Sequence, residues 1–298
     1  MDAGSYPRYQ GDVYRPPSEA DSLILQVMYG CSHGDCQFCG MYTGKPFRIR
    51  PSAEVREDIE GLAPALKGHV RRVFLCDGDA LALPVRSLVG LLDLLAAELP
   101  RLERVSAYAS AHSLLRKSAQ ELRELREHGL QLLYVGLESG DDRTLSAMGK
   151  GLTVAEQIEG CRKAKEAGCA LAIMAILGLG GMESSLEHAR GTAGALSAID
   201  PDYISMLSLM LAPGAPLVES VRRGEFRIPD APALLRELRE IISGTNVTKA
   251  VFRTTHASNY LALEGTLPAD KQAMLQVLDQ VLAMGDAAPL RPEYLRGF

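Results

Sequence analysis

The chain has 298 residues, of which 47% are hydrophobic and 23% charged, a composition typical of a soluble globular protein with a substantial core. Its formal charge of −5 gives no electrostatic reason to expect nucleic-acid or anionic-membrane binding. No apolar run approaches the length of a membrane span, and the polar, proline-rich N-terminus lacks the apolar core of a secretory signal, so we expect a cytoplasmic location.

Short apolar runs alternate along the chain with amphipathic stretches of helical period. Strands are predicted at Leu23–Val27, Val73–Cys76, Val105–Tyr108, Leu132–Leu137, Cys169–Leu177, Tyr203–Leu209 and Ala250–Arg253. Helices are predicted at about 52–66, 84–99, 114–128, 153–167, 184–197, 232–243 and 269–284. Gly129 and Gly168 directly follow two of these helices, as a left-handed C-terminal cap requires.

This alternation predicts an α/β fold with a parallel sheet. Repeated strand–helix units without a dinucleotide-binding glycine fingerprint favour a partial or complete parallel βα barrel of the TIM type. No composition break marks a linker, so we interpret residues 21–298 as one barrel domain that follows an N-terminal extension at 1–20. In such barrels the chemistry lies in the loops after the carboxyl ends of the strands.

Three cysteines lie close together in the loop after the first predicted strand, in the stretch GCSHGDCQFCGMY at 30–42. They are Cys31, Cys36 and Cys39. A tight group of thiols in a reducing compartment indicates a metal rather than disulfides. Three thiolates on a four-iron cluster leave one iron open to a substrate or cofactor, so three ligands favour chemistry over scaffolding.

Two other metal sites fit these residues less well. The spacing C-x4-C-x2-C occurs in plant-type two-iron ferredoxins, with Cys76 here as the plausible fourth ligand, but those proteins are small β-rich domains. A zinc site with His33 as fourth ligand would strain the geometry, because His33 lies inside the first cysteine interval. Cys161 and Cys169 fall on a predicted helix and strand and are interpreted as core residues.

The stretch at 30–42 resembles the cluster-binding motif of the radical S-adenosylmethionine (SAM) superfamily. The usual motif is C-x3-C-x2-C with an aromatic residue before the last cysteine; Phe38 fills that position, and the first interval here is one residue longer. The resemblance covers roughly residues 20–215. It is strongest for the branch that includes the elongator acetyltransferase subunit, the methylthiotransferases and anaerobic coproporphyrinogen oxidase. It implies a [4Fe-4S] cluster held by the three cysteines.

Three later segments also resemble this superfamily. CDGDA (76–80) looks like the motif that receives the SAM amino group, GLESGD (136–141) like the ribose-contacting segment, and AILGLGG (175–181) like the glycine-bearing adenine segment. The residues implied as cofactor contacts, together with Phe38, are Asp77, Gly78, Asp79, Glu138, Gly178, Gly180 and Gly181. Each also has a structural interpretation: an Asp–Gly turn, a salt bridge, or the end of a strand.

His256 and Asn259 follow the last predicted strand, in RTTHASNYL at 253–261. They are candidate catalytic residues at the substrate side of the barrel, within a C-terminal segment at about 245–298. The same side chains could instead satisfy loop backbone groups or cap a helix. Both interpretations stay open at this point.

The resemblance implies an enzyme that cleaves SAM reductively to a 5′-deoxyadenosyl radical, which abstracts hydrogen from a substrate. It also implies an external one-electron donor such as flavodoxin or ferredoxin, and we expect an unidentified small-molecule substrate. The reaction class, whether oxidoreductase, transferase or lyase, stays open. The alternative function is an iron–sulfur electron-transfer or redox-sensing protein without turnover. The nucleoside-binding segments count against it, because an electron carrier needs no nucleoside pocket.

Overall fold

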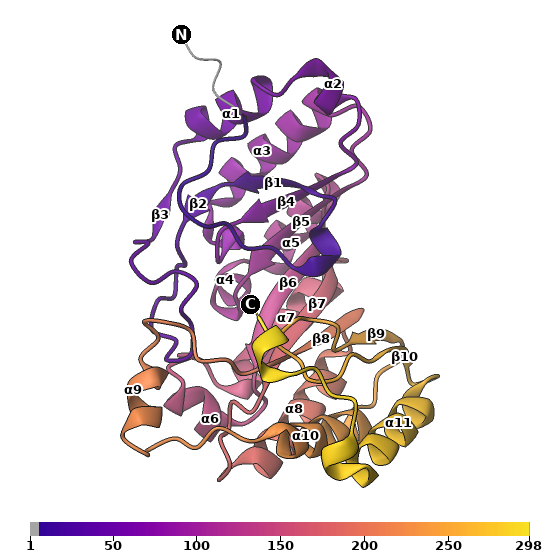
Figure 1. The fold of residues 1–298 in the computed structure, drawn as a ribbon. Helices are drawn as coiled ribbons and strands as arrows, with labels where there is room; N and C mark the ends of the chain where they lie inside the picture. Colours follow the sequence, from indigo (N-terminus) through magenta and orange to yellow (C-terminus); the bar gives the residue numbers. More distant parts are fainter. Residues whose placement is uncertain (1–5, 298) are drawn as a thin grey trace. The chain divides into compact units, whose positions relative to one another are not determined.

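The computed structural model describes residues 6–297 (Figure 1). The chain divides into two compact units. Unit 1 comprises Met1–Gly34, Met41–Val135 and Arg162–Leu171, and unit 2 comprises Asp35–Gly40, Gly136–Cys161 and Ala172–Phe298. The assignment of residues 21–298 to one domain stays a prediction.

Unit 1 is built on parallel strands that pair side by side. They are β1 (Leu23–Gln26), β4 (Arg72–Cys76), β5 (Arg104–Ala109) and the first part of β6 (Leu130–Glu138). The residues Val73–Cys76 of β4 are buried without alternation, as expected for a parallel strand that is covered on both faces. The helices of this unit are α1 (Ser52–Glu60), α2 (Pro64–Lys67), α3 (Val85–Glu98), α4 (Ala111–Arg116) and α5 (Ala119–Glu127).

Unit 2 continues with parallel strands and ends in an antiparallel hairpin. Its strands are the end of β6, all of β7 (Ala170–Leu177) except its first two residues, β8 (Tyr203–Ser208), β9 (Ala250–Arg253) and β10 (Glu264–Leu267). Its helices are α6 (Asp142–Ala147), α8 (Ser185–Ile199), α9 (Leu217–Arg222), α10 (Ala231–Gly244) and α11 (Lys271–Ala283), while α7 (Val154–Glu166) belongs to both units. Helix α10 packs against α8 and α11.

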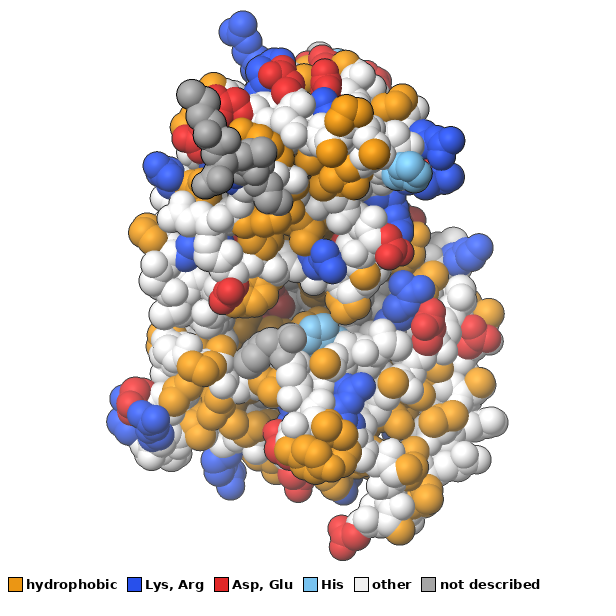
Figure 2. Space-filling view, turned by 45° about the horizontal axis from the view of Figure 1, so that its top comes forward, with side chains coloured by type: hydrophobic (Ala, Val, Ile, Leu, Met, Phe, Trp, Pro, Cys, Tyr) orange, Lys and Arg blue, Asp and Glu red, His pale blue; other side chains and the backbone are white. Residues whose placement is uncertain are grey.

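The strands form one mostly parallel sheet in the order β1-β4-β5-β6-β7-β8-β9-β10, and β2 (Met28–Tyr29) and β3 (Arg48–Ile49) form a separate pair. Over the described residues the sheet is open, as in a partial TIM-like barrel, so the predicted fold class is confirmed. No helix within residues 6–297 is long and apolar enough to cross a membrane. On the face shown in Figure 2, acidic and basic side chains are interspersed, consistent with the small net charge.

All seven predicted strands are present, with small shifts at their ends. Two predicted helices are wrong in extent, because each is interrupted. The first ends at Glu60, with Gly61 as its C-cap, and restarts at Pro64. The other is broken at Lys117, and Ser118 and Glu121 form a capping box that begins α5. The short elements α6, α9, β2, β3 and β10 are not predicted from the sequence, because they hold too few residues for a clear period.

The segment before β1 is anchored by a buried carboxylate. Glu19 ends a short 3-10 helix, Pro17–Glu19, and is fully buried in unit 1. Its Oε1 accepts hydrogen bonds from Tyr134 Oη at 2.7 Å and Ser106 Oγ at 3.0 Å, and pairs with Arg104 Nη2 at 2.7 Å. The N-terminal extension is therefore fixed to the strands of unit 1 at its last turn.

Candidate functional site

The cysteine loop divides between the two units, with Cys31 in unit 1 and Cys36 and Cys39 in unit 2. All three thiols are half-buried, and none is in a disulfide. The Cys39 amide donates to the Cys36 carbonyl oxygen at 3.2 Å, which closes a tight turn. No group of three His, Cys, Asp or Glu side chains within residues 6–297 is assembled for a metal ion, so the three-cysteine ligand set stays a prediction from the motif.

The second half of the loop is anchored within unit 2. The Gln37 amide donates to the Met148 carbonyl at 2.9 Å, and the Gln37 carbonyl accepts from the Leu217 amide at 2.9 Å. Phe38 packs against an apolar cluster that contains Met148, Leu217 and Leu209. The aromatic residue of the motif therefore has a packing role here, and its contact with a cofactor stays a prediction.

The three scattered cysteines are core residues, as predicted for Cys161 and Cys169. Cys76, Cys161 and Cys169 are all buried. Burial raises the pKa of Cys161 to about 12 and that of Cys169 to about 11. Burial, aided by the neighbouring charge of Asp77, also raises the pKa of Cys76 well above its usual range. Cys76 lies within the buried strand β4, which is the environment of a core residue.

Asp77 lies at the carboxyl end of β4 and is fully buried. Its Oδ2 accepts from the Gly30 amide at 3.1 Å and from Gln26 Nε2 at 3.0 Å, and pairs with Lys45 Nζ at 2.7 Å. Its Oδ1 is buried with no hydrogen-bond partner among the described residues. The carboxylate therefore holds Gly30, the residue before Cys31, through Oδ2, while Oδ1 is available to a ligand.

Asp79 is also fully buried, but both of its oxygens are occupied. Its Oδ2 accepts from Ser32 Oγ at 2.6 Å, Ser110 Oγ at 2.7 Å and Ser113 Oγ at 2.6 Å. Its Oδ1 accepts from the Ser110 amide at 2.9 Å. Asp79 therefore ties the cysteine loop, through Ser32, to the start of α4. The serines were missed because they come from two separate stretches of sequence.

Gly78, between these carboxylates, allows a close approach that no other residue would. A Cβ at this position would lie 2.7 Å from Cys31 Cβ, 2.8 Å from Tyr42 Cε2 and 3.0 Å from Cys31 Sγ. The Gly78 amide also donates to the Gly30 carbonyl at 3.1 Å. The glycine of CDGDA thus brings Cys31 and Tyr42 together in unit 1.

Glu138 ends β6 in a left-handed conformation, with φ of 64°. Such a backbone costs about 1–3 kcal/mol for a residue other than glycine and is concentrated at functional sites. The side chain pairs with Lys150 Nζ at 3.1 Å, and the two side chains are only 15% and 12% exposed. The strained backbone and the partly buried ion pair support a functional role, while the contact of Glu138 with SAM stays a prediction.

The glycines after β7 pack against helices of unit 2. Gly178 has φ of 83°, and its amide donates to the buried Glu237 Oε1 of α10 at 2.6 Å. A Cβ on Gly178 would lie 2.8 Å from Leu234, also on α10, and one on Gly180 would crowd α8. Gly181 has φ of 64°. Tight packing and turn geometry thus explain these glycines, and their adenine contact stays a prediction.

Asn259 holds the loop after β9 to β8. It is buried, and its Nδ2 donates to the carbonyl oxygens of Met206 at 2.7 Å and Thr254 at 3.0 Å. Its Oδ1 accepts from Ser208 Oγ at 2.8 Å. These bonds give Asn259 a positioning role in unit 2, and its predicted catalytic role stays untested.

His256 is half-buried in the same loop. The Ser258 amide donates to His256 Nδ1 at 3.1 Å, which leaves the proton of the neutral ring on Nε2. Burial, and then the charge of Arg291, lowers the pKa of His256 below its usual value. The ring is thus held as a neutral Nε2–H donor, and no partner for Nε2 lies among the described residues.

The depressed pKa of His256 predicts a stability change with pH. The unfolded ring titrates near about 6.5, so the folded state gains stability from the neutral ring above that pH and loses it as the pH falls through the folded pKa. We expect the difference in unfolding free energy between the wild type and His256→Asn to narrow from pH 7.5 to pH 5.5. Denaturant titrations at the two pH values measure this difference, and the control is His69→Asn, which changes an exposed histidine. A difference that widened as the pH fell would contradict the prediction.

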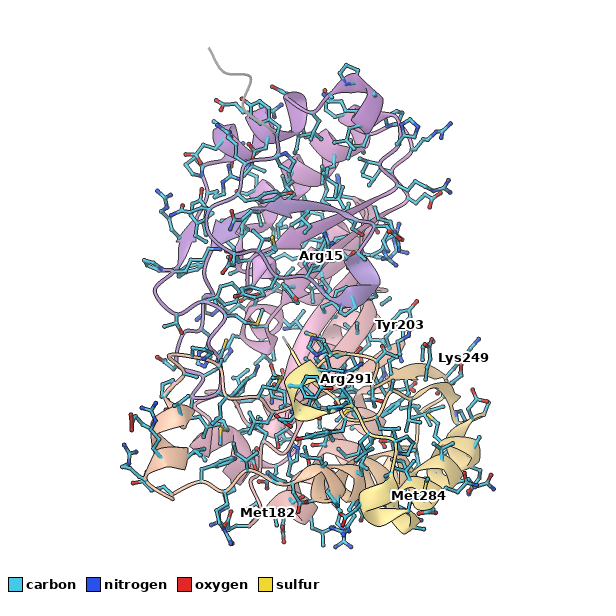
Figure 3. All side chains as sticks on the ribbon, viewed as in Figure 1. Arg15, Met182, Tyr203, Lys249, Met284 and Arg291 are labelled. Carbon is cyan, nitrogen blue, oxygen red and sulfur yellow. The ribbon has the colours of Figure 1, made fainter. Side chains whose placement is uncertain are left out.

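The C-terminal residues clasp the loop that carries His256 and Asn259. Arg291, labelled in Figure 3, donates from Nη1 to the carbonyl oxygens of Ala257 at 2.7 Å and Asn259 at 2.9 Å. Arg296 stacks on the Tyr260 ring at 4.0 Å and donates from Nε to the Ser258 carbonyl at 2.7 Å. This clasp is not predictable from the sequence, because isolated arginines carry no periodic signal.

We expect Arg296→Ala to destabilise the chain by about 2–3 kcal/mol, since it leaves the carbonyls of Ser258 and Leu209 without their charged donor. Hydrogen exchange in the loop at 254–261 should accelerate. Arg253→Ala is the matched control: Arg253 forms an exposed pair with Glu264 at 3.0 Å, a kind of contact worth at most about 1 kcal/mol. Equal losses of unfolding free energy in the two variants would show that the contacts of Arg296 do not stabilise the loop.

Comparisons with known proteins show the family and the fold. Residues 25–190 match the sequence family described as the Radical SAM superfamily. The heme chaperone HemW of Bacillus subtilis (strain 168) is 23% identical over 205 residues, which are 67% of this chain and 53% of HemW. The tRNA-2-methylthio-N(6)-dimethylallyladenosine synthase of Ralstonia pickettii (strain 12J) is 30% identical over 174 residues, 53% of this chain and 36% of the synthase.

Among solved structures, coproporphyrinogen III oxidase (HemN) from Escherichia coli, described as a radical SAM enzyme, shares the fold. It has a TM-score of 0.57 and 18% identity, over 74% of this chain and 51% of the oxidase. The chain thus spans about half, or less, of the length of these relatives.

Proposed function

This chain belongs to the radical SAM superfamily, and we propose from that premise that Cys31, Cys36 and Cys39 hold a [4Fe-4S] cluster that binds SAM. Enzymes of this superfamily use both cofactors, and the predicted resemblance is confirmed. When bound, the reduced cluster and SAM supply a 5′-deoxyadenosyl radical that takes hydrogen from a substrate. The observation that carries the assignment is the contrast among the six cysteines: the three of the motif are half-buried, and the other three are buried.

The residues beside Cys31 fit the chemistry of these cofactors. The buried polar atoms without a hydrogen-bond partner among the described residues of unit 1 include Asp77 Oδ1, an acceptor, and the Tyr42 hydroxyl, a donor. Unpartnered buried groups cost about 1–3 kcal/mol each, so a bound polar group would remove a penalty that the protein alone carries. An ammonium suits the open oxygen of Asp77.

We therefore assign different roles to the two carboxylates. Asp77 would receive the amino group of SAM through Oδ1 while its Oδ2 holds Gly30. Asp79, whose oxygens are filled by serines, is a positioning residue that fixes Ser32 in the cysteine loop. The further SAM contacts that we propose are Gly78, Glu138, Gly178, Gly180 and Gly181, with Phe38 beside the cluster.

The proposal extends to a small-molecule substrate, an external one-electron donor such as flavodoxin or ferredoxin, and a cytoplasmic location. His256, held as a neutral Nε2–H donor, would orient an acceptor group of the substrate, and Asn259 would position its loop. The heme and tRNA activities named for the relatives are not transferred, because the chain spans only part of those proteins.

The test is anaerobic reconstitution with iron and sulfide, followed by reduction and addition of SAM. We expect a four-iron electron paramagnetic resonance signal that SAM perturbs, together with formation of 5′-deoxyadenosine. A two-iron signal indifferent to SAM, with no nucleoside formed, would overturn the proposal and favour the alternative function of electron transfer or redox sensing without turnover.

A further inference from the structure

Tyr42 is the last residue of the cysteine stretch at 30–42, and it belongs to unit 1, as Cys31 does. A Cβ on Gly78 would touch both Tyr42 Cε2 and Cys31 Sγ, so the ring edge and the thiol face the same small space. The Tyr14 ring packs edge-to-face on Tyr42, with ring centroids 6.0 Å apart, and Lys45 Nζ lies 6.0 Å from its centroid. The ring is therefore held in place from several directions.

The hydroxyl of this ring is the unexplained group. It is buried, and it has no hydrogen-bond partner among the described residues. Asp77, the nearby buried carboxylate, directs Oδ2 to Lys45 and leaves Oδ1 open, yet the hydroxyl does not pair with it. A protein that needed only the ring would place phenylalanine here, because a buried phenol without a partner is destabilising.

We propose that the Tyr42 hydroxyl donates a hydrogen bond to a sulfur of the cluster on its Cys31 side, an inference that rests on the proposed function. Cluster sulfurs accept hydrogen bonds, and such bonds help to set the reduction potential. Reduction adds negative charge to the cluster, so the bond is stronger in the reduced form and raises the potential. Tyr42 thus favours the reduced state of the cluster.

The first measurement is a redox titration of reconstituted Tyr42→Phe without SAM, followed by electron paramagnetic resonance. We expect normal iron and sulfide content and a more negative midpoint potential. A tenfold fall in the ratio of reduced to oxidised cluster at fixed potential corresponds to about 59 mV for one electron. An unchanged potential would overturn the proposal. An unchanged potential with weaker SAM binding would instead assign the hydroxyl to SAM.

The second measurement uses the chain without its cluster, so it does not depend on activity. Tyr42→Phe should then be as stable as the wild type or more stable, because the hydroxyl has no protein partner to lose. The matched control is Tyr134→Phe, which loses the bond to Glu19 at 2.7 Å and should destabilise the chain while leaving the potential unchanged. Destabilisation of the cluster-free Tyr42→Phe would show a protein partner and overturn the proposal.

These outcomes separate the inference from the proposed function. If the wild type assembles no four-iron cluster, the proposed function fails before Tyr42 is tested. If the wild type assembles one that SAM perturbs and Tyr42→Phe matches it in potential, the inference about Tyr42 alone fails.

Discussion

Cys36→Ala is expected to lose the four-iron signal and to lower 5′-deoxyadenosine formation by more than about a hundredfold. Loss of a partner outside the ligand set already costs about 10–100-fold at metal sites, and loss of a ligand removes more. Iron and sulfide analysis, paramagnetic resonance and nucleoside assay measure the effect on the reconstituted protein.

The matched control for Cys36→Ala is Cys169→Ala, which removes a buried thiol at the start of β7 and should keep the cluster. Cys76→Ala distinguishes the competing ligand sets. If Cys76→Ala lost the cluster while Cys36→Ala kept it, Cys76 would be a ligand and the three-cysteine assignment would be wrong.

Asp79→Asn is expected to be the most damaging change to stability that we consider, at about 3 kcal/mol or more. The amide NH2 cannot accept the hydroxyl bonds that now converge on one carboxylate, so serine hydroxyls, among them that of the buried Ser113, lose their partner. The free energy of unfolding of the cluster-free chain measures this loss directly. Hydrogen exchange around Ser32 should also accelerate.

The control for Asp79→Asn is Asp93→Asn. Asp93 is exposed and pairs with His128 at 2.6 Å, so its replacement should cost at most about 1 kcal/mol. If Asp79→Asn proved no more destabilising than this surface change, the hydrogen bonds from the serines to Asp79 would contribute little to stability. Asp79 would then be better explained as a residue that binds a ligand.

The different roles of Asp77 and Asp79 could not be predicted from the sequence. CDGDA follows a buried strand, so position alone indicated that Asp77 and Asp79 lie near the cysteine loop. What separates them is their partners: Ser110 and Ser113 for Asp79, and Lys45 for Asp77. Those residues lie some thirty positions away in the chain, and single-sequence patterns report neighbours within a few residues.

The strands and the three clustered thiols were predictable for a different physical reason. Buried parallel strands form long apolar runs, and the cysteines lie within nine positions of one another, so both signals are local. The clasp by Arg291 and Arg296, the open hydroxyl of Tyr42 and the left-handed backbone of Glu138 arise from tertiary packing. No local pattern encodes them.

The different burial of the six cysteines has a practical consequence for measuring cofactor loading. Alkylating reagents attack thiolates that solvent can reach, so the half-buried thiols of the cysteine loop should react quickly in the cluster-free chain. The buried thiols, with their raised pKa values, should react only on unfolding. Mass spectrometry after a brief alkylation pulse should therefore count three rapid additions in the cluster-free chain. Iron bound to those thiols would suppress the same additions, which makes the count a direct gauge of occupancy.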